Sequence, residues 1–432
     1  MLAWVLGKGV RPELNRLNDI ILGCCKCLLS AQSPCLLCVA KFESLIGGGS
    51  IQTGCYIYTI TVQSMGDMVR TNDDLDRICE DAMNAPWLGV DTEFERIRTY
   101  YPKLCLLQLS TPDWTVCIDP LAKIGAAPLS RVLGPSGPLK IIHSARQDQE
   151  VIHCEYGVLP APLFDTQIAA SFCGFGEQVS YAALVDEICS VKLAKSHTRT
   201  AWCRRPLTPQ QIDYALDDAR YLGRLYARLD QELARMHRGS WAVEEFEALC
   251  SPGILEGSQR SAVEKVSNAA RSMDRVGQSI ASVLVLWREQ VAKQRNLPRQ
   301  WILSDKQILA IAVLQPRDRS DLRQLDQSAA ASVKRWGDVL IEQVAKGQRQ
   351  VEQYAARKPV GKRSATEKAL DSQLWTRLKE LAAAAGIPTS VVARRDELRA
   401  LARGDRGLGV LSGWRYEFAG RELLVIADKY MN

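Results

Sequence analysis

The sequence of 432 residues has few of the groups on which nucleophilic catalysis depends. It contains only four histidines, no Gly-x-Ser-x-Gly elbow, and no glycine-rich phosphate loop beyond the short run at 47–49. A nucleophile-and-base enzyme is therefore poorly supported. The apolar stretch 20–39 is broken by Lys26, Gln32 and Pro34, so it is too interrupted for a membrane helix, and it lacks the features of a signal peptide. Neither a membrane partner nor a small-molecule cofactor is expected.

Fourteen cysteines are present, without a regular pairing pattern. Six of them fall within the first 55 residues, where the pairs Cys24-x-x-Cys27 and Cys35-x-x-Cys38 suggest zinc. Only seven residues separate the two pairs, which is shorter than the usual ribbon spacing, so zinc is the weaker interpretation. The other eight lie in apolar contexts such as LCLLQL and FCGF, which is typical of reduced, buried cysteines. We therefore predict a cytoplasmic protein with reduced cysteines.

Composition and charge divide the chain into unequal parts. Residues 1–64 do not resemble the remainder, and we interpret them as a leader of doubtful function or an over-long start. Residues 1–240 hold 24 Lys and Arg against 26 Asp and Glu, whereas residues 241–432 hold 31 against 23. A basic second part suggests a unit that binds a polyanion, and the alternative is an ordinary basic helical surface.

The most informative stretch is residues 87–110, WLGVDTEFERIRTYYPKLCLLQLS. Its two apolar ends predict two strands joined by a basic, tyrosine-rich turn. Because side chains alternate along a strand, Asp91 and Glu93 should project from one face and Thr92 from the other. The apolar runs indicate a largely buried sheet, where unpaired carboxylates are costly. A metal site is favoured over the alternative of two surface acids.

Strands alternate with helices from residue 69 to residue 236, which predicts an α/β domain. Asp148 should follow its fourth strand, in the first turns of a helix with Ser144 near the cap. Thr208, Pro209 and Gln211 form a capping-box start for a long helix through Met236. On that helix Tyr214 and Asp218 are four residues apart and share a face. Asp91, Glu93, Asp148 and Asp218 could then converge at one end of the sheet, although taken alone Tyr214 could simply be a packed aromatic.

The chain beyond residue 257 is predicted to be helical, and it contains an internal repeat at an offset of 90 residues. Leu297-Pro298 corresponds to Ile387-Pro388, and Ile302 corresponds to Val392. The sequence therefore predicts two copies of one small helical module, joined by the basic linker 356–363.

These motifs together resemble a known family. Asp91-Thr92-Glu93-Phe94, His143-x-x-x-x-Asp148 and Tyr214-x-x-x-Asp218 are similar to the three exonuclease motifs of the DEDD superfamily, tyrosine subclass. The flanking segments are similar to those of ribonuclease D, and the two repeats resemble its helicase-and-RNase-D C-terminal (HRDC) domains. The resemblance covers about residues 66–432. It implies an α/β ribonuclease-H-like exonuclease domain, with a mixed sheet flanked by helices, at 65–240, followed by two all-α HRDC-like bundles at 258–352 and 365–432.

The resemblance also implies an activity, namely 3′-to-5′ hydrolysis of RNA with release of nucleoside 5′-monophosphates. Precursor transfer RNA 3′ ends are the substrate that the family suggests. Two divalent cations, Mg²⁺ or Mn²⁺, would be held by Asp91, Glu93, Asp148 and Asp218, since hard oxygen ligands suit these ions. Tyr214 would orient the attacking water, and its ordinary pKa of about 10 makes orientation easier than deprotonation.

Contacts to the nucleic acid are expected from residues near these motifs. His143 and Gln108 would either support the site or touch the terminal nucleotide, and an arginine cluster that includes Arg204 is a candidate phosphate contact. The expected set is Phe94, Gln108, His143, Arg199 and Arg205. Two rival functions remain: a DNA proofreading or repair exonuclease, and a non-catalytic RNA-binding scaffold. The scaffold would require that at least one of the four acids is missing, and all four are present.

Overall fold

The computed structural model describes residues 37–41, 56–60, 68–194, 200–352 and 364–431. The chain divides into two units, 1–66 and 67–432. In the first unit the described residues form an antiparallel pair, β1 (Leu37–Lys41) and β2 (Tyr56–Ile60). The expected leader is otherwise outside the described residues, as are Cys24, Cys27 and Cys35 of the zinc alternative, Arg199 and the basic linker.

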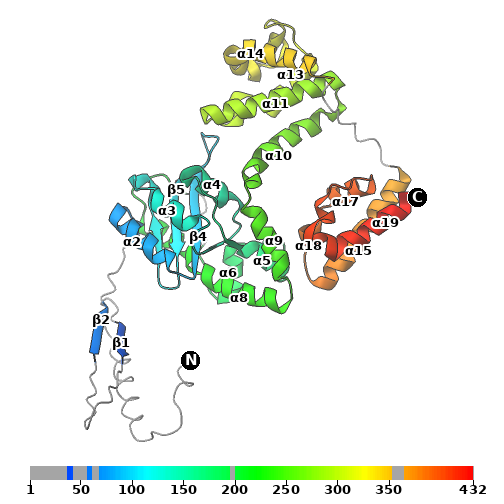
Figure 1. Cartoon of the computed structure of the whole chain (residues 1–432). Helices are drawn as coiled ribbons and strands as arrows, with labels where there is room; N and C mark the ends of the chain where they lie inside the picture. Colours follow the sequence, from blue (N-terminus) through cyan, green and yellow to red (C-terminus); the bar gives the residue numbers. More distant parts are fainter. Residues whose placement is uncertain (1–36, 42–55, 61–67, 195–199, 353–363, 432) are drawn as a thin grey trace, which may run out of the picture. The chain divides into compact units, whose positions relative to one another are not determined.

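The second unit begins with a six-stranded mixed sheet in the order β3-β6-β5-β4-β7-β8. Strands β4 and β5 of this sheet are labelled in Figure 1. The central strand β4 pairs antiparallel with β5 and parallel with β7. Leu88, Val90 and Leu104 to Leu107 are at most 1% exposed, so the apolar runs of the sequence do lie in the core. The predicted mixed sheet is confirmed. Its strands are β3 (Met68–Val69), β4 (Trp87–Glu95), β5 (Lys103–Ser110), β6 (Thr115–Ile118), β7 (Leu139–Ile142) and β8 (Leu163–Asp165).

Eight helices accompany the sheet among the described residues 68–250. The capping box predicted at Thr208 and Gln211 is present. The single long helix predicted through Met236 is wrong, because the helix breaks at Tyr221. The helices are α2 (Asn72–Met83), α3 (Ala127–Leu133), α4 (Arg146–Tyr156), α5 (Thr166–Phe172), α6 (Tyr181–Cys189), α7 (Pro209–Arg220), α8 (Leu222–Arg235) and α9 (Gly239–Leu249).

An inserted hydroxyl explains the break between α7 and α8. In a continuous helix the backbone N–H of Tyr221 would donate to the carbonyl of Asp217. Instead the Tyr181 hydroxyl donates to Asp217 O at 3.0 Å and accepts from Tyr221 N at 3.2 Å. A side chain that enters the helical ladder in this way kinks or ends the helix.

The turn that leads from β7 into α4 also differs from the prediction. Ser144 does not cap α4, which begins at Arg146 without a side-chain cap, and Ser144 itself has a left-handed φ of 64°. The Asp165 carboxylate, at the end of β8, accepts hydrogen bonds from the backbone N–H groups of Ser144 (3.2 Å) and Ala145 (2.8 Å). A long-range contact therefore fixes the turn that precedes Asp148.

The described residues from 253 to 431 are helical. The order α11–α12–α13 of the first repeat recurs as α15–α16–α17 in the second, as the internal repeat predicts. Each long helix ends in a left-handed residue at the same repeat position, Asn296 (φ 47°) and Gly386 (φ 64°). The bounds are α10 (Gly253–Ala269), α11 (Arg275–Arg295), α12 (Arg299–Ile302), α13 (Asp305–Leu314), α14 (Ala330–Arg349), α15 (Ala365–Ala385), α16 (Thr389–Val392), α17 (Arg395–Ala402), α18 (Gly413–Arg415) and α19 (Arg421–Met431).

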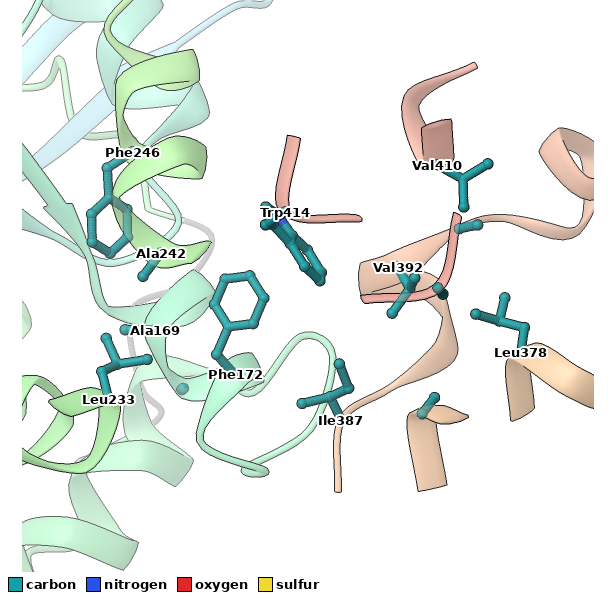
Figure 2. Close-up of a cluster of buried hydrophobic side chains, with 14 of the residues drawn as sticks. Ala169, Phe172, Leu233, Ala242, Phe246, Leu378, Ile387, Val392, Val410 and Trp414 are labelled. Atoms are coloured by element: carbon teal, nitrogen blue, oxygen red, sulfur yellow. The ribbon is translucent and has the colours of Figure 1, made fainter. Parts of the chain in front are cut away.

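The two modules differ in how they are packed. The first has a hydrophobic cluster formed mainly by its own helices. The second shares one cluster with α5, α8 and α9 of the α/β domain (Figure 2). In this cluster the Trp414 ring lies 5.1 Å from that of Phe172 and stacks on Trp241 at 4.9 Å. The second module and the α/β domain therefore share one hydrophobic core.

The prediction that all cysteines outside the first 55 residues are reduced is wrong at one pair. Cys105 on β5 and Cys203, in the segment before α7, form a disulfide across 98 residues of sequence. Cys79, Cys117, Cys154 and three other described cysteines are not part of a disulfide. Among the described residues, no helix is long and apolar enough to cross a membrane.

Candidate active site

Three carboxylates from two distant parts of the chain meet at the central strand. Asp91 and Glu93 lie on β4, and Asp218 lies near the end of α7. One carboxylate oxygen from each lies within 4.8 Å of the others, close enough for the three to share a cation. The alternation of side chains along β4 places the first two on one face, and the packing of α7 against β4 brings the third.

The electrostatics of this cluster are unfavourable without a counter-charge. Burial and the neighbouring acids, chiefly Asp218, raise the pKa of Asp91 well above its usual value and that of Glu93 to about 8. Burial, followed by the charge of Asp217, raises the pKa of Asp218 to about 7. At neutral pH these groups retain protons that a divalent cation would displace.

The fourth predicted acid, Asp148, is held in the first turn of α4 and is only 7% exposed. The Thr92 hydroxyl donates to its Oδ1 at 2.5 Å. Burial raises the pKa of Asp148 to about 7, although the hydrogen bond from Thr92 opposes the shift. The charge of Asp148 also raises the pKa values of Asp91 and Glu93, although Asp148 is not one of the three carboxylates that lie within 4.8 Å of one another. Sequence reasoning missed the role of Thr92, because only the packing of α4 against β4 brings the two residues together.

Tyr214 lies one helical turn before Asp218, and its hydroxyl hydrogen-bonds to that carboxylate. Burial and the nearby charges of Asp218, Glu93 and Asp91 raise the pKa of Tyr214 well above its ordinary value. The expectation of an unperturbed phenol is therefore wrong. A phenol that stays protonated can donate a hydrogen bond but cannot serve as a base at neutral pH.

Two further residues of the predicted site, His143 and Gln108, are withdrawn from solvent to different degrees. The His143 ring nitrogens lie 2.9 Å from Thr166 Oγ1 and 3.1 Å from Val179 O, so both are engaged. Burial lowers the pKa of His143. Gln108 is paired with Asp91 across β4 and β5 and is fully buried, so it cannot touch a nucleotide. Its amide atoms have no protein partner, which leaves them available to orient a polar group beside Asp91.

The other residues expected to contact nucleic acid divide into structural and exposed ones. Arg205 donates from Nε and Nη2 to the two Asp119 oxygens at 2.8 and 2.7 Å, and from Nη2 to Cys105 O at 2.6 Å. It therefore braces the segment before α7 and is not free for RNA. Arg204 is exposed, and Phe94, at the end of β4, is partly exposed. Arg199 lies outside the described residues.

Comparisons with known proteins agree with this arrangement. A 3′-5′ exonuclease family model matches residues 67–234, and an HRDC domain model matches residues 278–344. The chain is 33% identical over 365 residues to ribonuclease D of Nitrobacter hamburgensis, covering 83% of this chain and 94% of that protein. It is 36% identical over 372 residues to ribonuclease D of Jannaschia sp., covering 83% of this chain and 95% of that protein. The crystal structure of Escherichia coli RNase D, described as an exoribonuclease involved in structured RNA processing, matches with a TM-score of 0.74 and 29% identity, covering 84% of this chain and 98% of that one.

Proposed function

Because the chain belongs to the ribonuclease D family and is a 3′-to-5′ exoribonuclease, we propose that the carboxylate cluster around Asp91 is its catalytic centre. The observation that carries this proposal is the convergence of Asp91 and Glu93 of the first motif with Asp218 of the third, within ligand distance of one another. A non-catalytic scaffold would have no use for such a costly cluster.

The proposed cofactor is a pair of divalent cations, Mg²⁺ or Mn²⁺. The donor set fits, because it consists of carboxylate oxygens and because the raised pKa values of Glu93 and Asp218 report repulsion and desolvation that a cation would relieve. Asp91, Glu93 and Asp218 would hold the ions, with Asp148 completing the set. Bound divalent ions supply Lewis acidity for the attacking water and the leaving 3′ oxygen.

The protein groups have separate roles in the proposed reaction. Water adds to the terminal phosphodiester, the bond from phosphorus to the 3′ oxygen breaks, and a nucleoside 5′-monophosphate leaves. Tyr214, which remains protonated, orients the water while its contact to Asp218 fixes the ring position. Thr92 holds Asp148, and the buried Gln108 amide supports the polar groups beside Asp91.

The proposed substrate is RNA with a 3′ extension, and precursor transfer RNA is the candidate that the family suggests. The net positive charge of residues 241–432 supports capture of a polyanion by the helical part of the chain, because the acidic site itself repels phosphates. The cytoplasm is the proposed location, since the substrate is RNA.

The test is digestion of 5′-labelled RNAs with structured or unstructured 3′ tails, in Mg²⁺, Mn²⁺ or chelator, by wild type and by Asp91→Asn and Asp148→Asn. Each substitution removes a proposed ligand without changing side-chain size, so cleavage should fall by more than about a hundredfold while RNA binding persists. Asp213→Asn, an exposed change on the same helix as Asp218, is the matched control. Activity of both variants within about tenfold of wild type would refute the assignment.

A further inference from the structure

A hollow of about 810 Å³ lies between the turn that joins β4 to β5 and the first HRDC-like module. One wall is Arg96 to Tyr100, and the other is formed by α10, α12 and the start of α13. We call this hollow the hairpin groove. It shares no residue with the carboxylate cluster, and its size is within the range of ligand-binding clefts.

Hydrogen bonds hold the two walls of the hairpin groove together. Asn296 Oδ1 accepts from the backbone N–H groups of Tyr100 and Tyr101 at 3.0 Å each. The Tyr100 hydroxyl bonds to Glu289 (3.1 Å) and to Arg299 (3.0 Å), whose guanidinium lies over the Tyr100 ring. Glu289 is fully buried, so its contact with the Tyr100 hydroxyl is partly shielded from solvent, whereas the two backbone contacts to Asn296 are exposed. Together these contacts hold the walls of the groove in place.

The lining combines apolar surface with positive charge. Two large apolar side chains of the lining are exposed to solvent, Ile97 at 73% and Trp301 at 55%. Lys265 and Lys306 project beside them with 76% and 81% of their side chains exposed. Lys265 pairs with Asp305 and Lys306 with Asp326, and both ion pairs are weak because they lie near the surface. Each ammonium group can therefore leave its carboxylate and bind a phosphate instead. Aromatic surface flanked by cations fits unpaired bases and their backbone.

The internal repeat shows that the fold of the module does not require Trp301. At the offset of 90 residues, Trp301 of α12 corresponds to Val391 of α16. Val391 is partly buried against the cluster shared with the exonuclease domain. The second module thus uses this position for packing, whereas the first exposes a large ring in a groove.

The hairpin groove is also within reach of an RNA bound at the carboxylates. Ile97 follows Glu93 by four residues, and an extended chain advances about 3.3 Å per residue, so their Cα atoms are at most about 13 Å apart. Nucleotides a few positions upstream of a 3′ end held at Asp91 and Glu93 can therefore reach the groove.

We propose that the hairpin groove binds the unpaired RNA segment just upstream of the 3′ end, with a base stacked on Trp301 and phosphates near Lys265 and Lys306. This inference rests on the proposed function of the carboxylate cluster. It predicts that substrate length matters: a dinucleotide ends before the groove, and a longer single strand enters it.

The test measures the affinity of the full chain for single-stranded RNAs of increasing length, in an Asp91→Asn background so that nothing is cleaved. Trp301→Val introduces the residue that the second module carries at this position. Wild type should bind long RNA more tightly than short RNA. Trp301→Val should weaken the binding of long RNA by about tenfold, the effect of one lost stacking contact, and so remove most of this difference. Val313→Ala, another exposed apolar site on the same module, should keep the gain.

A second experiment tests the role of positive charge with the variant Lys306→Gln. Its control is Lys346→Gln, which removes an exposed lysine on α14, outside the groove. Lys306→Gln should lower the dependence of affinity on salt for long RNA, and its control should not. If Trp301→Val binds RNA of every length as wild type does, while its melting temperature is normal, the proposal is overturned and the groove serves a protein or no ligand. Failure of the proposed function would instead appear as absence of cleavage of even short RNA by the chain with native Asp91.

Discussion

Thr92 donates a hydrogen bond of 2.5 Å to Asp148, and so links the first exonuclease motif to the second. Thr92 lies between Asp91 and Glu93 on β4, but its side chain leaves the strand on the opposite side. A single strand therefore presents two proposed ligands directly and positions a third through a hydroxyl. This arrangement explains why a β-branched hydroxyl residue is useful at the middle position of the motif.

The first prediction concerns this hydroxyl. Thr92→Val keeps the shape of the side chain but leaves the buried Asp148 carboxylate without its donor, which costs about 1–3 kcal/mol for a buried polar group. We expect the concentration of Mg²⁺ needed for half-maximal activity to rise by about tenfold, in the range measured for groups that orient metal ligands. Thr92→Ser retains a hydroxyl and should restore much of the metal affinity. Equal metal dependence in all three proteins would show that the contact is dispensable.

The second prediction links pH, metal and stability. Glu93, with a pKa near 8, and Asp148 and Asp218, with pKa values near 7, bind protons in the folded protein that carboxyls of the unfolded chain lose near pH 4. The folded state therefore holds more protons between about pH 4 and pH 8, and its stability falls as pH rises through that range.

The melting temperature of the chelated protein should accordingly fall from about pH 5 to pH 8, and saturating Mg²⁺ should reverse most of the fall. Calorimetric titration with Mg²⁺ near pH 7 should also show proton release. Glu93→Gln removes one titrating group, so its melting temperature should depend less on pH. A chelated protein whose melting temperature rises steadily over this range would contradict the assigned pKa shifts.

The third prediction assigns Tyr214 to the orientation of water. Its raised pKa and its contact to Asp218 favour a neutral phenol that donates a hydrogen bond. Tyr214→Phe should lower kcat by about two orders of magnitude or more, with little change in metal dependence. The pH profile should show no lost ionisation, because the phenol does not titrate in the working range. A fall of less than about threefold would mean that Tyr214 only packs against Trp202, whose ring centroid lies 6.1 Å away.

Local signals in the sequence predicted the parts of the site that depend on one element. The alternation on β4 placed Asp91 and Glu93 together, and helical spacing placed Tyr214 and Asp218 on one face. The capping box at Thr208 also follows from local chemistry. These features were predictable because strand and helix geometry alone determines them.

Features that depend on distant contacts were not predictable. The break at Tyr221 needs the hydroxyl of Tyr181, which lies 40 residues earlier. The pairing of Arg205 with Asp119 and the Cys105–Cys203 disulfide both depend on how the segment before α7 folds onto β5 and β6. No periodicity in the sequence encodes such partners, since each partner is known only after the sheet is assembled.

The last prediction follows from the core that the exonuclease domain shares with the second module. Trp414 is 5% exposed, it packs on Phe172 and Trp241, and its indole N–H donates to Glu245 at 2.8 Å. Trp414→Ala would leave a cavity and remove one of the two hydrogen bonds to Glu245 Oε1, to which Arg415 also donates. A buried Trp truncated to Ala typically costs about 3–5 kcal/mol. Because the cavity opens against α5 and α9, the loss should appear in the catalytic domain itself.

We expect Trp414→Ala to lower the temperature at which cleavage of a short oligonucleotide is lost. Trp336→Ala, in the separate core of the first module, is the matched control and should leave that temperature near the wild-type value. If both variants lose cleavage at the same temperature, the second module is not a structural part of the catalytic domain. If the prediction holds, a chain cut after Gly257 would expose Phe172 and Trp241, so the role of the helical part in RNA capture has to be tested by point substitutions in an intact chain.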